Sequence, residues 1–221
     1  MKTISKFAIS TLLRLLIGLL IGLLFAPSLG WTTVEWDSSR LMMKNAEQVN
    51  DLIKNKIKKA QAVQAKQLES DDGIKADPAA IQYLEDATRI LLARPDQDGT
   101  RAVAFSRLRR ELVDLNAFDD VLKDLGKEGI EGLKDSDAPI TRQATYVTIL
   151  ENLMAELKPE VPTSPVFKKI LEDIRDAKIE ISDKVKVQQL LRAMSKPVSP
   201  SETAGKILES VEKKDDPKKK K

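Results

Sequence analysis

Residues 77–93 read DPAAIQYLEDATRILLA, and this stretch carries the start, the buried face and the end of an α-helix. Asp77 followed by Pro78 is typical of a helix start, because the aspartate side chain accepts from an unpaired N–H and proline fits the first turn. Pro95 ends the pattern. The apolar face recurs at helical spacing and consists of Ile81, Leu84, Thr88 and Leu91. The sequence therefore predicts a helix over residues 78–93.

The same signals recur downstream and predict an all-α fold. Ala, Leu, Lys, Glu and Asp are abundant, and the alternation typical of half-buried strands is almost absent. Val103, Leu108, Leu112 and Leu115 are expected on the inner face of their helix. Short turns join the helices, which predicts a compact bundle or stacked helical hairpins. The helices are expected over 100–115, 118–125, 127–133, 140–157, 165–178 and 183–194, with a last one around 207–211.

Residues 133–144 read LKDSDAPITRQA and resemble the turn and second helix of a HEAT or armadillo repeat. In such repeats an Asp-containing turn precedes a branched apolar residue and an Arg. Here Thr141 separates Ile140 from Arg142, where the two residues are usually adjacent. The resemblance covers one unit, implies stacked helical hairpins and carries over no functional residue.

A long helix is expected upstream, because residues 33–68 contain neither Pro nor Gly. With Met42 at a d position, six of the eight a and d positions are apolar, which is typical of a narrow packing seam. We predict that this seam binds a partner protein. An outer helix of a bundle within the same chain is the alternative. The seam consists of Met42, Ala46, Val49, Ile53, Ala60 and Val63.

This helix also carries Lys54, Lys56, Lys58, Lys59 and Lys66. Along a straight helix, Lys54 lies roughly 35 Å beyond Trp31, several Debye lengths of about 8 Å. Phospholipid head groups are therefore not the expected partner. The lysines predict a solvated face or a docking stripe for an acidic neighbour.

The amino-terminal segment is predicted to enter a membrane. Lys2 and Lys6 precede an uncharged run of 17 residues, 15–31, which is near the lower limit for a spanning helix. Gly18 and Gly22 form a GxxxG pair, although glycines are also common in such segments. The anchor is expected to involve Arg14, Gly18, Gly22, Trp31 and Trp36, with the tryptophans at the outer interface.

Two outcomes are open for this segment. A retained anchor is the favoured prediction, and a cleaved secretory signal ending near Ser28 or Gly30 is the alternative. Basic residues precede the apolar run, whereas Glu35 and Asp37 follow it. The positive-inside rule then places the amino terminus in the cytoplasm and the helical part outside the inner (cytoplasmic) membrane, on the periplasmic side.

The residue inventory argues against an enzyme. The chain has no cysteine and no histidine, which removes zinc sites, haem ligation, thiol nucleophiles and histidine-based triads. No GxxxxGK[ST], GxGxxG or GxSxG motif occurs. Asp96 and Asp98 resemble a calcium loop, but Arg94 and Phe105 stand where it needs carboxylates. We therefore expect no catalytic residue, no cofactor and no metal.

Charge argues against nucleic acid as a partner. Lys2, Lys6 and Arg14 account for the whole net charge of +3, and the lysine-rich tail leaves the central part weakly acidic. Arg107, Arg109 and Arg110 share one helix. They could clamp a phosphate, but ion pairs with Glu111 and Asp114 in the same helix are the default expectation.

Together these patterns predict four segments: a signal-anchor (1–31), a long amphipathic, coiled-coil-like helix (32–70), an α-helical domain (78–195), and a short helix with a basic tail (196–221). The expected function is a non-enzymatic scaffold of a cell-envelope membrane complex. Its partners would be other membrane or envelope proteins, the bilayer through the first helix, or a second copy of the chain. The alternative is a periplasmic ligand-binding or carrier module released by signal-peptide cleavage.

Overall fold

The computed structural model describes residues 44, 46–69, 76–94, 100–135, 137–181, 185–186 and 199–212. The chain divides into two compact units, Met1–Val34 and Glu35–Lys221, and all described residues belong to the second. Within the described ranges every regular element is a helix and no β-strand occurs. The prediction of an all-α fold is confirmed for this part.

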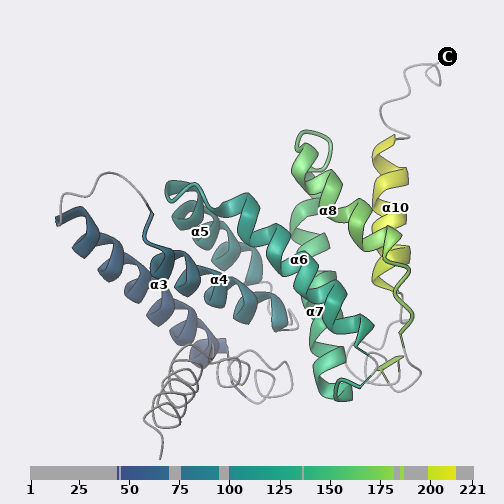
Figure 1. Ribbon diagram of the computed structural model, residues 1–221, viewed down its shortest axis with the longest axis horizontal. Helices are drawn as coiled ribbons and strands as arrows, with labels where there is room; N and C mark the ends of the chain where they lie inside the picture. Colours follow the sequence, from purple (N-terminus) through teal and green to yellow (C-terminus); the bar gives the residue numbers. More distant parts are fainter. Residues whose placement is uncertain are drawn as a thin grey trace, which may run out of the picture. The chain divides into compact units, whose positions relative to one another are not determined.

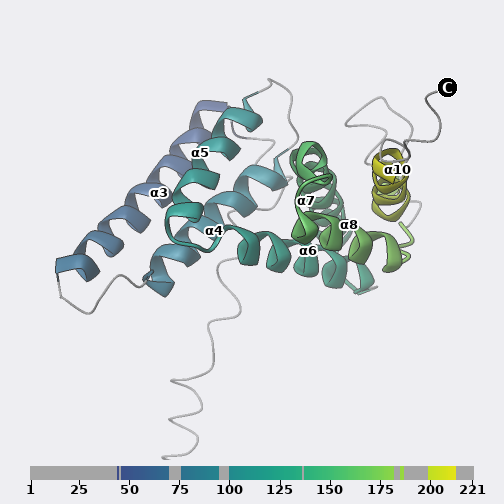
Figure 2. The same cartoon turned by 90° about the horizontal axis from the view of Figure 1, so that it is seen from above.

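The first three described helices pack against one another (Figures 1 and 2). Both α3 and α5 pack on α4, and α3 also contacts α5. In Figure 1, α3 and α4 lie side by side and run in opposite directions. These helices are α3 (Ala46–Glu69), α4 (Pro78–Ala93) and α5 (Arg101–Asp114).

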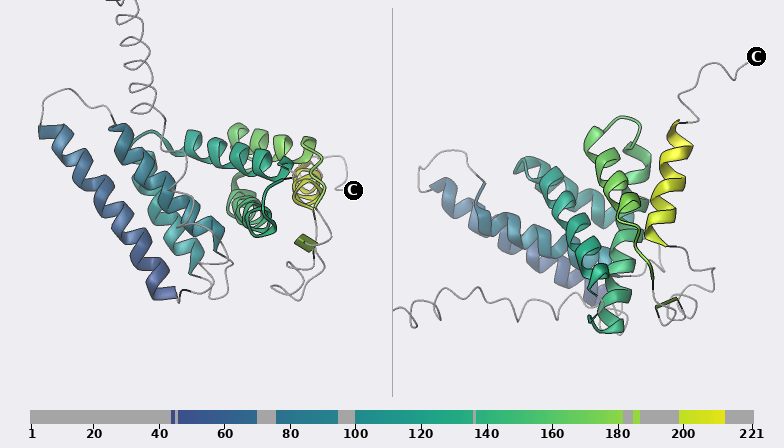
Figure 3. Two further views of the ribbon diagram at one scale, coloured as in Figure 1. Left: turned by 60° about the horizontal axis from the view of Figure 1, so that its bottom comes forward. Right: turned by 45° about the vertical axis from the view of Figure 1, so that its right-hand side comes forward.

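The remaining helices form a second group around α7, which is also the element that packs on α4. α6 packs on α7 and α8, and α10 packs chiefly on α8 (Figure 3). The group consists of α6 (Phe118–Lys134), α7 (Ile140–Leu157), the short 3₁₀ helix η2 (Lys158–Glu160), α8 (Pro165–Asp176) and α10 (Pro200–Glu212).

One hydrophobic core runs through both groups and receives side chains from every described α-helix. α7 is the most deeply placed: Val147, Leu150, Leu153 and Leu157 are fully buried. Burying one such leucine contributes about 1.5–3 kcal/mol. The apolar spacing along residues 140–157 therefore identified the centre of the fold.

The helix starts follow the predicted chemistry where a capping residue precedes proline. Asp77 Oδ1 accepts from the Ala79 N–H at 2.7 Å, and Ser164 Oγ accepts from the Phe167 N–H at 3.3 Å. α4 and α7 have the predicted bounds. Thr100 precedes α5 as expected but makes no capping hydrogen bond. These caps are local, so the sequence alone could specify them.

The two short helices predicted over 118–125 and 127–133 are in fact one continuous helix, α6. Three glycines of α6 lie where neighbouring side chains approach its backbone. A β-carbon on Gly129 would lie 2.6 Å from Leu150 Cδ2, and one on Gly132 would lie 2.1 Å from Tyr146 Cε2. Both neighbours belong to α7. The glycines therefore permit close packing of α6 on α7.

Two features predicted from the sequence lie outside the described residues. The first is the predicted anchor, which lies within the undescribed segment 1–43. The second is the helix predicted over 183–194, of which only residues 185–186 are described. Of the helices within the described ranges, none combines the length and the apolar character that crossing a bilayer requires.

Candidate interaction surface

The seam predicted on the long helix packs inside the chain. Val49, Ile53 and Ala60 are buried in the core where α3 packs on α4, and Val63 is partly buried against it. Ala46 begins α3, its side chain is not described, and Met42 lies outside the described residues. These buried residues pack on α4 of the same chain, which agrees with the alternative prediction that this is a helix of a bundle within the chain. As arranged here, their side chains have no surface left for a second protein.

The true buried stripe of α3 includes Ile57, which the a/d pattern omitted. The spacing of Val49, Ile53, Ile57 and Ala60 follows a straight helix rather than a heptad seam. Lys56 of α3 donates to Asp86 of α4 at 3.0 Å. For this lysine, the acidic neighbour that we predicted lies in the same chain.

α5 is fixed at its amino-terminal end by α7. Arg101 Nε donates to Glu156 Oε1 at 2.8 Å, and its Nη1 donates to Asn152 Oδ1 at 2.6 Å. The Asn152 amide in turn donates to the backbone carbonyls of Leu92 and Arg94, at 2.7 and 2.9 Å. One buried asparagine thus joins the end of α4 to the start of α5.

The rest of α5 is held by α3 and by the end of η2. Gln61 of α3 donates to both carboxylate oxygens of Glu111, at 3.0 and 3.1 Å. Arg109 forms a two-pronged ion pair with Glu160, and its guanidinium lies 5.1 Å from the centre of the Phe118 ring. The sequence predicted that Arg109 would form ion pairs within its own helix. In the structure it pairs instead with Glu160 of η2.

The opposite face of α5 carries apolar side chains in solvent. Val103 is 76% exposed and Val113 is 53% exposed; with Leu68 they are the exposed large hydrophobic residues of the described part. Val103 was predicted to point inward, and this prediction is wrong. Phe105 occupies the core position, because it lies three residues from the buried Leu108 whereas Val103 lies five.

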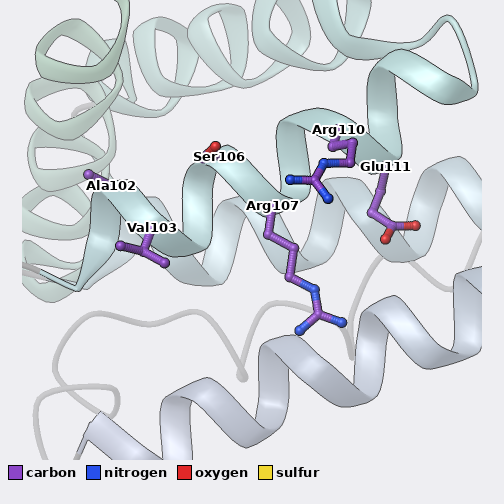
Figure 4. A pocket seen from close by; sticks show the side chains of 6 residues that line it. All are labelled: Ala102, Val103, Ser106, Arg107, Arg110 and Glu111. Atoms are coloured by element: carbon purple, nitrogen blue, oxygen red, sulfur yellow. The ribbon is translucent and has the colours of Figure 1, made fainter.

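Two arginines lie among these valines. Arg107 and Arg110 are exposed and make no ion pair with any described residue. In Figure 4, Arg107 extends from α5 toward α3, and Glu111 lies further along the same helix. We call Val103, Arg107, Arg110 and Val113 the α5 outer face. A groove of about 670 Å³ runs along part of this face and is lined by Ala102, Val103, Ser106, Arg107, Arg110 and Glu111; Val113 lies outside this lining.

A partly buried charge network lies on another side of α4. Arg89 donates to Glu128 of α6 and to Glu85 and Asp86 of its own helix. Burial alone would lower the pKa of Arg89, but the three carboxylates outweigh it and the pKa is raised. Burial raises the pKa of Glu85, and Arg89 opposes this only in part. The network joins helices and leaves no open site for a ligand.

A second cavity, of about 540 Å³, lies between α6 and α8. Its apolar lining is Ile130, Ile170 and Ala177 with Gly126, and lysines and acids surround it in equal number. Several of these charges pair along their own helix, such as Lys169 with Asp173 at 2.9 Å. Across the described ranges no group of three or more carboxylates is placed to hold a metal ion.

The residues predicted for the anchor, Arg14, Gly18, Gly22, Trp31 and Trp36, lie outside the described residues. No known protein family, curated protein or solved structure matches this chain. The case for a function therefore depends on the chain's own residues, and among the described ones the α5 outer face is the strongest candidate.

Proposed function

We propose that this chain is a non-enzymatic scaffold subunit of a cell-envelope membrane complex and that it binds a partner protein through the α5 outer face. The observation that carries the proposal is the contrast between the two sides of α5. Its inner and lateral sides are tied to three other elements, yet its outer face exposes Val103 and Val113 beside two arginines that pair with no described residue.

This combination suits a protein interface. Arginine and large apolar side chains are enriched where partners bind, and a preorganised helix loses little conformational entropy on binding. A specific interface usually needs about 800 Å² on each partner. α5 alone is short for this area, so we expect the adjoining side of α3 to contribute.

The proposed location depends on the sequence. The uncharged run 15–31, preceded by basic residues, supports a retained single-pass anchor with the amino terminus inside. The helical unit would then face the periplasm and meet partners held at the same membrane. Stacked helical hairpins, as the likeness of residues 133–144 to HEAT and armadillo repeats implies, would suit such a binding platform.

Co-purification tests the scaffold role. The full chain is purified in an uncharged detergent as the wild type, as Val103→Asp/Val113→Asp, and as the matched control Asn55→Asp/Ala155→Asp, whose sites are also exposed. We expect a stoichiometric partner with the wild type and the control, and its loss with the valine variant. A strictly monomeric wild-type protein without a partner would contradict the proposal.

The cavity between α6 and α8 favours a second function, a periplasmic ligand-binding or carrier module. That function requires release from the membrane by cleavage near Ser28 or Gly30. Mass spectrometry of the mature amino terminus separates the two functions. An intact Met1 or Lys2 excludes release, whereas a new terminus after residue 28 or 30 would support the carrier.

A further inference from the structure

We infer that the partner docks through an acidic amphipathic helix, which lies in the groove where the α5 outer face borders α3. This inference rests on the proposed function and deepens it, because it names the chemistry of the partner's docking segment.

Positive charge without an ion pair to any described residue lies in the groove lining and on the neighbouring helix α3. Arg107 and Arg110 project from α5, and Lys58 is exposed on α3 without an ion pair to any described residue. Helical periodicity places Lys54 and Lys58 on the same side of α3 as Gln61, the residue that reaches Glu111 of α5. Two acids also lie nearby: Glu111 accepts from Gln61, and Asp51 pairs with Lys54 at 3.6 Å.

The apolar spacing fits a helix as occupant. Val103 and Val113 are ten residues apart, which is roughly 15 Å along α5. A helix that buries apolar residues at i, i+3 or i+4, i+7 and i+11 covers a similar length, roughly 16 Å. Glutamates or aspartates beside that stripe would meet Arg107, Arg110 and Lys58. Charge-assisted pairs of this kind give specificity and rapid association.

A second copy of the chain fits the groove poorly. A two-fold symmetric contact places the same face on both sides, so the unpaired arginines would repel their symmetry mates. Anionic lipid is also a poor match. Glu111 lines the groove, and the exposed Asp114 lies one turn beyond Arg110, so both acids would face the phosphates. A protein helix can avoid both conflicts through its sequence.

Two synthetic peptides test the inference. Each is an amidated, dye-labelled helix of about five turns with the same leucine stripe; one carries glutamate at its other positions and the second carries lysine. Fluorescence anisotropy measures their binding to the full chain in an uncharged detergent. We expect the acidic peptide to bind at least about tenfold more tightly than the basic one, and its affinity to fall as salt rises.

Variants assign the preference to the groove. Arg107→Glu/Arg110→Glu is expected to reverse it, Arg107→Gln/Arg110→Gln to abolish it, and the control Lys127→Glu/Lys168→Glu to keep it. All four substituted positions are exposed, and circular dichroism checks that each variant keeps its helix content. Equal binding of both peptides, or unchanged acidic binding by the arginine variants, would overturn the inference.

Two further outcomes separate the inference from the proposed function. If the natural partner is lost with Val103→Asp/Val113→Asp but retained by Arg107→Glu/Arg110→Glu, the scaffold role stands and the acidic helix is wrong. Vesicles of phosphatidylcholine and phosphatidylglycerol provide the second. Arginine-dependent binding to these vesicles that outcompetes the acidic peptide would also overturn the inference, because the ligand would then be lipid.

Discussion

Arg89 of α4 donates two hydrogen bonds to a single carboxylate oxygen of Glu128 on α6, from Nε at 3.1 Å and from Nη2 at 2.8 Å. The same guanidinium donates to Asp86, which also accepts from Lys56 of α3. One network thus joins three helices, α3, α4 and α6. Its members are mostly shielded from solvent, so it should contribute to stability more than the surface ion pairs do.

Replacing Arg89 is expected to destabilise the fold. Arg89→Met leaves Glu85 and Glu128 without this cation and Asp86 with Lys56 alone, and we expect the free energy of unfolding to fall by about 2–3 kcal/mol, less than for a fully buried pair. Urea denaturation of the full chain measures the change. Lys169→Met, which breaks the exposed pair with Asp173, is the control and should change little. Equal effects of the two substitutions would contradict this role for the network.

The raised pKa of Glu85 predicts a pH dependence. Between its usual value of 4.5 and its raised value in the folded state, the folded protein binds more protons than the unfolded chain. The contribution of Glu85 to stability is therefore largest at low pH and is lost as the pH rises through this window.

Glu85→Gln removes that titration. The difference in free energy of unfolding between wild type and Glu85→Gln should shift in favour of the variant as the pH rises from about 4.5 toward neutrality. Urea denaturation at a series of pH values measures it. A difference that is constant with pH, or that shifts toward the wild type, would contradict the raised pKa.

Two glycines in helices should respond to alanine in opposite ways. Gly129→Ala places a β-carbon against Leu150, and we expect a loss of about 1–3 kcal/mol from overpacking. Gly205 of α10 has only the Arg175 side chain nearby, at 3.8 Å, so Gly205→Ala should stabilise by about 0.5–1 kcal/mol through helix propensity. Thermal unfolding of both variants checks the signs. A stabilised Gly129→Ala would show that α6 does not need this close approach.

Asn152 is expected to hold the junction between α4 and α5. Asn152→Ala leaves the carbonyls of Leu92 and Arg94 without their donor, and we expect a cost of about 1–3 kcal/mol. Hydrogen exchange should speed up at the amino-terminal end of α5. Asn55→Ala, on the exposed side of α3, is the matched control and should cost nothing. Unchanged exchange in α5 would contradict the role of Asn152.

The sequence predicted what is encoded locally. The bounds of α4 and α7 agree with the structure, because the caps and prolines that set them lie within a few residues. Most of the predicted inner face of α4 is buried, including Leu84, Thr88 and Leu91. Helical spacing alone was sufficient for these features.

The sequence could not specify which element covers each stripe. An apolar stripe on α3 is the same whether another chain or α4 covers it. In the sequence alone, a glycine that ends a helix cannot be distinguished from one that allows a neighbouring helix to pack closely. The structure shows the second case, because Leu150 and Tyr146 pack against glycines of α6. Gln61 and Glu111 are 50 residues apart in the sequence, and no local pattern pairs them. Other contacts of α5 also join residues that lie far apart in the sequence. The α5 outer face followed only once these contacts were known.

Site-specific photo-crosslinking in cells tests the central claim most directly. A photoreactive amino acid replaces Val103 on the α5 outer face and, in a separate strain, Lys168 on the exposed side of α8. The account predicts one strong adduct of defined mass from position 103, which disappears when Val113→Asp is added, and no such adduct from position 168. Adducts from position 168 with none from position 103 would contradict it.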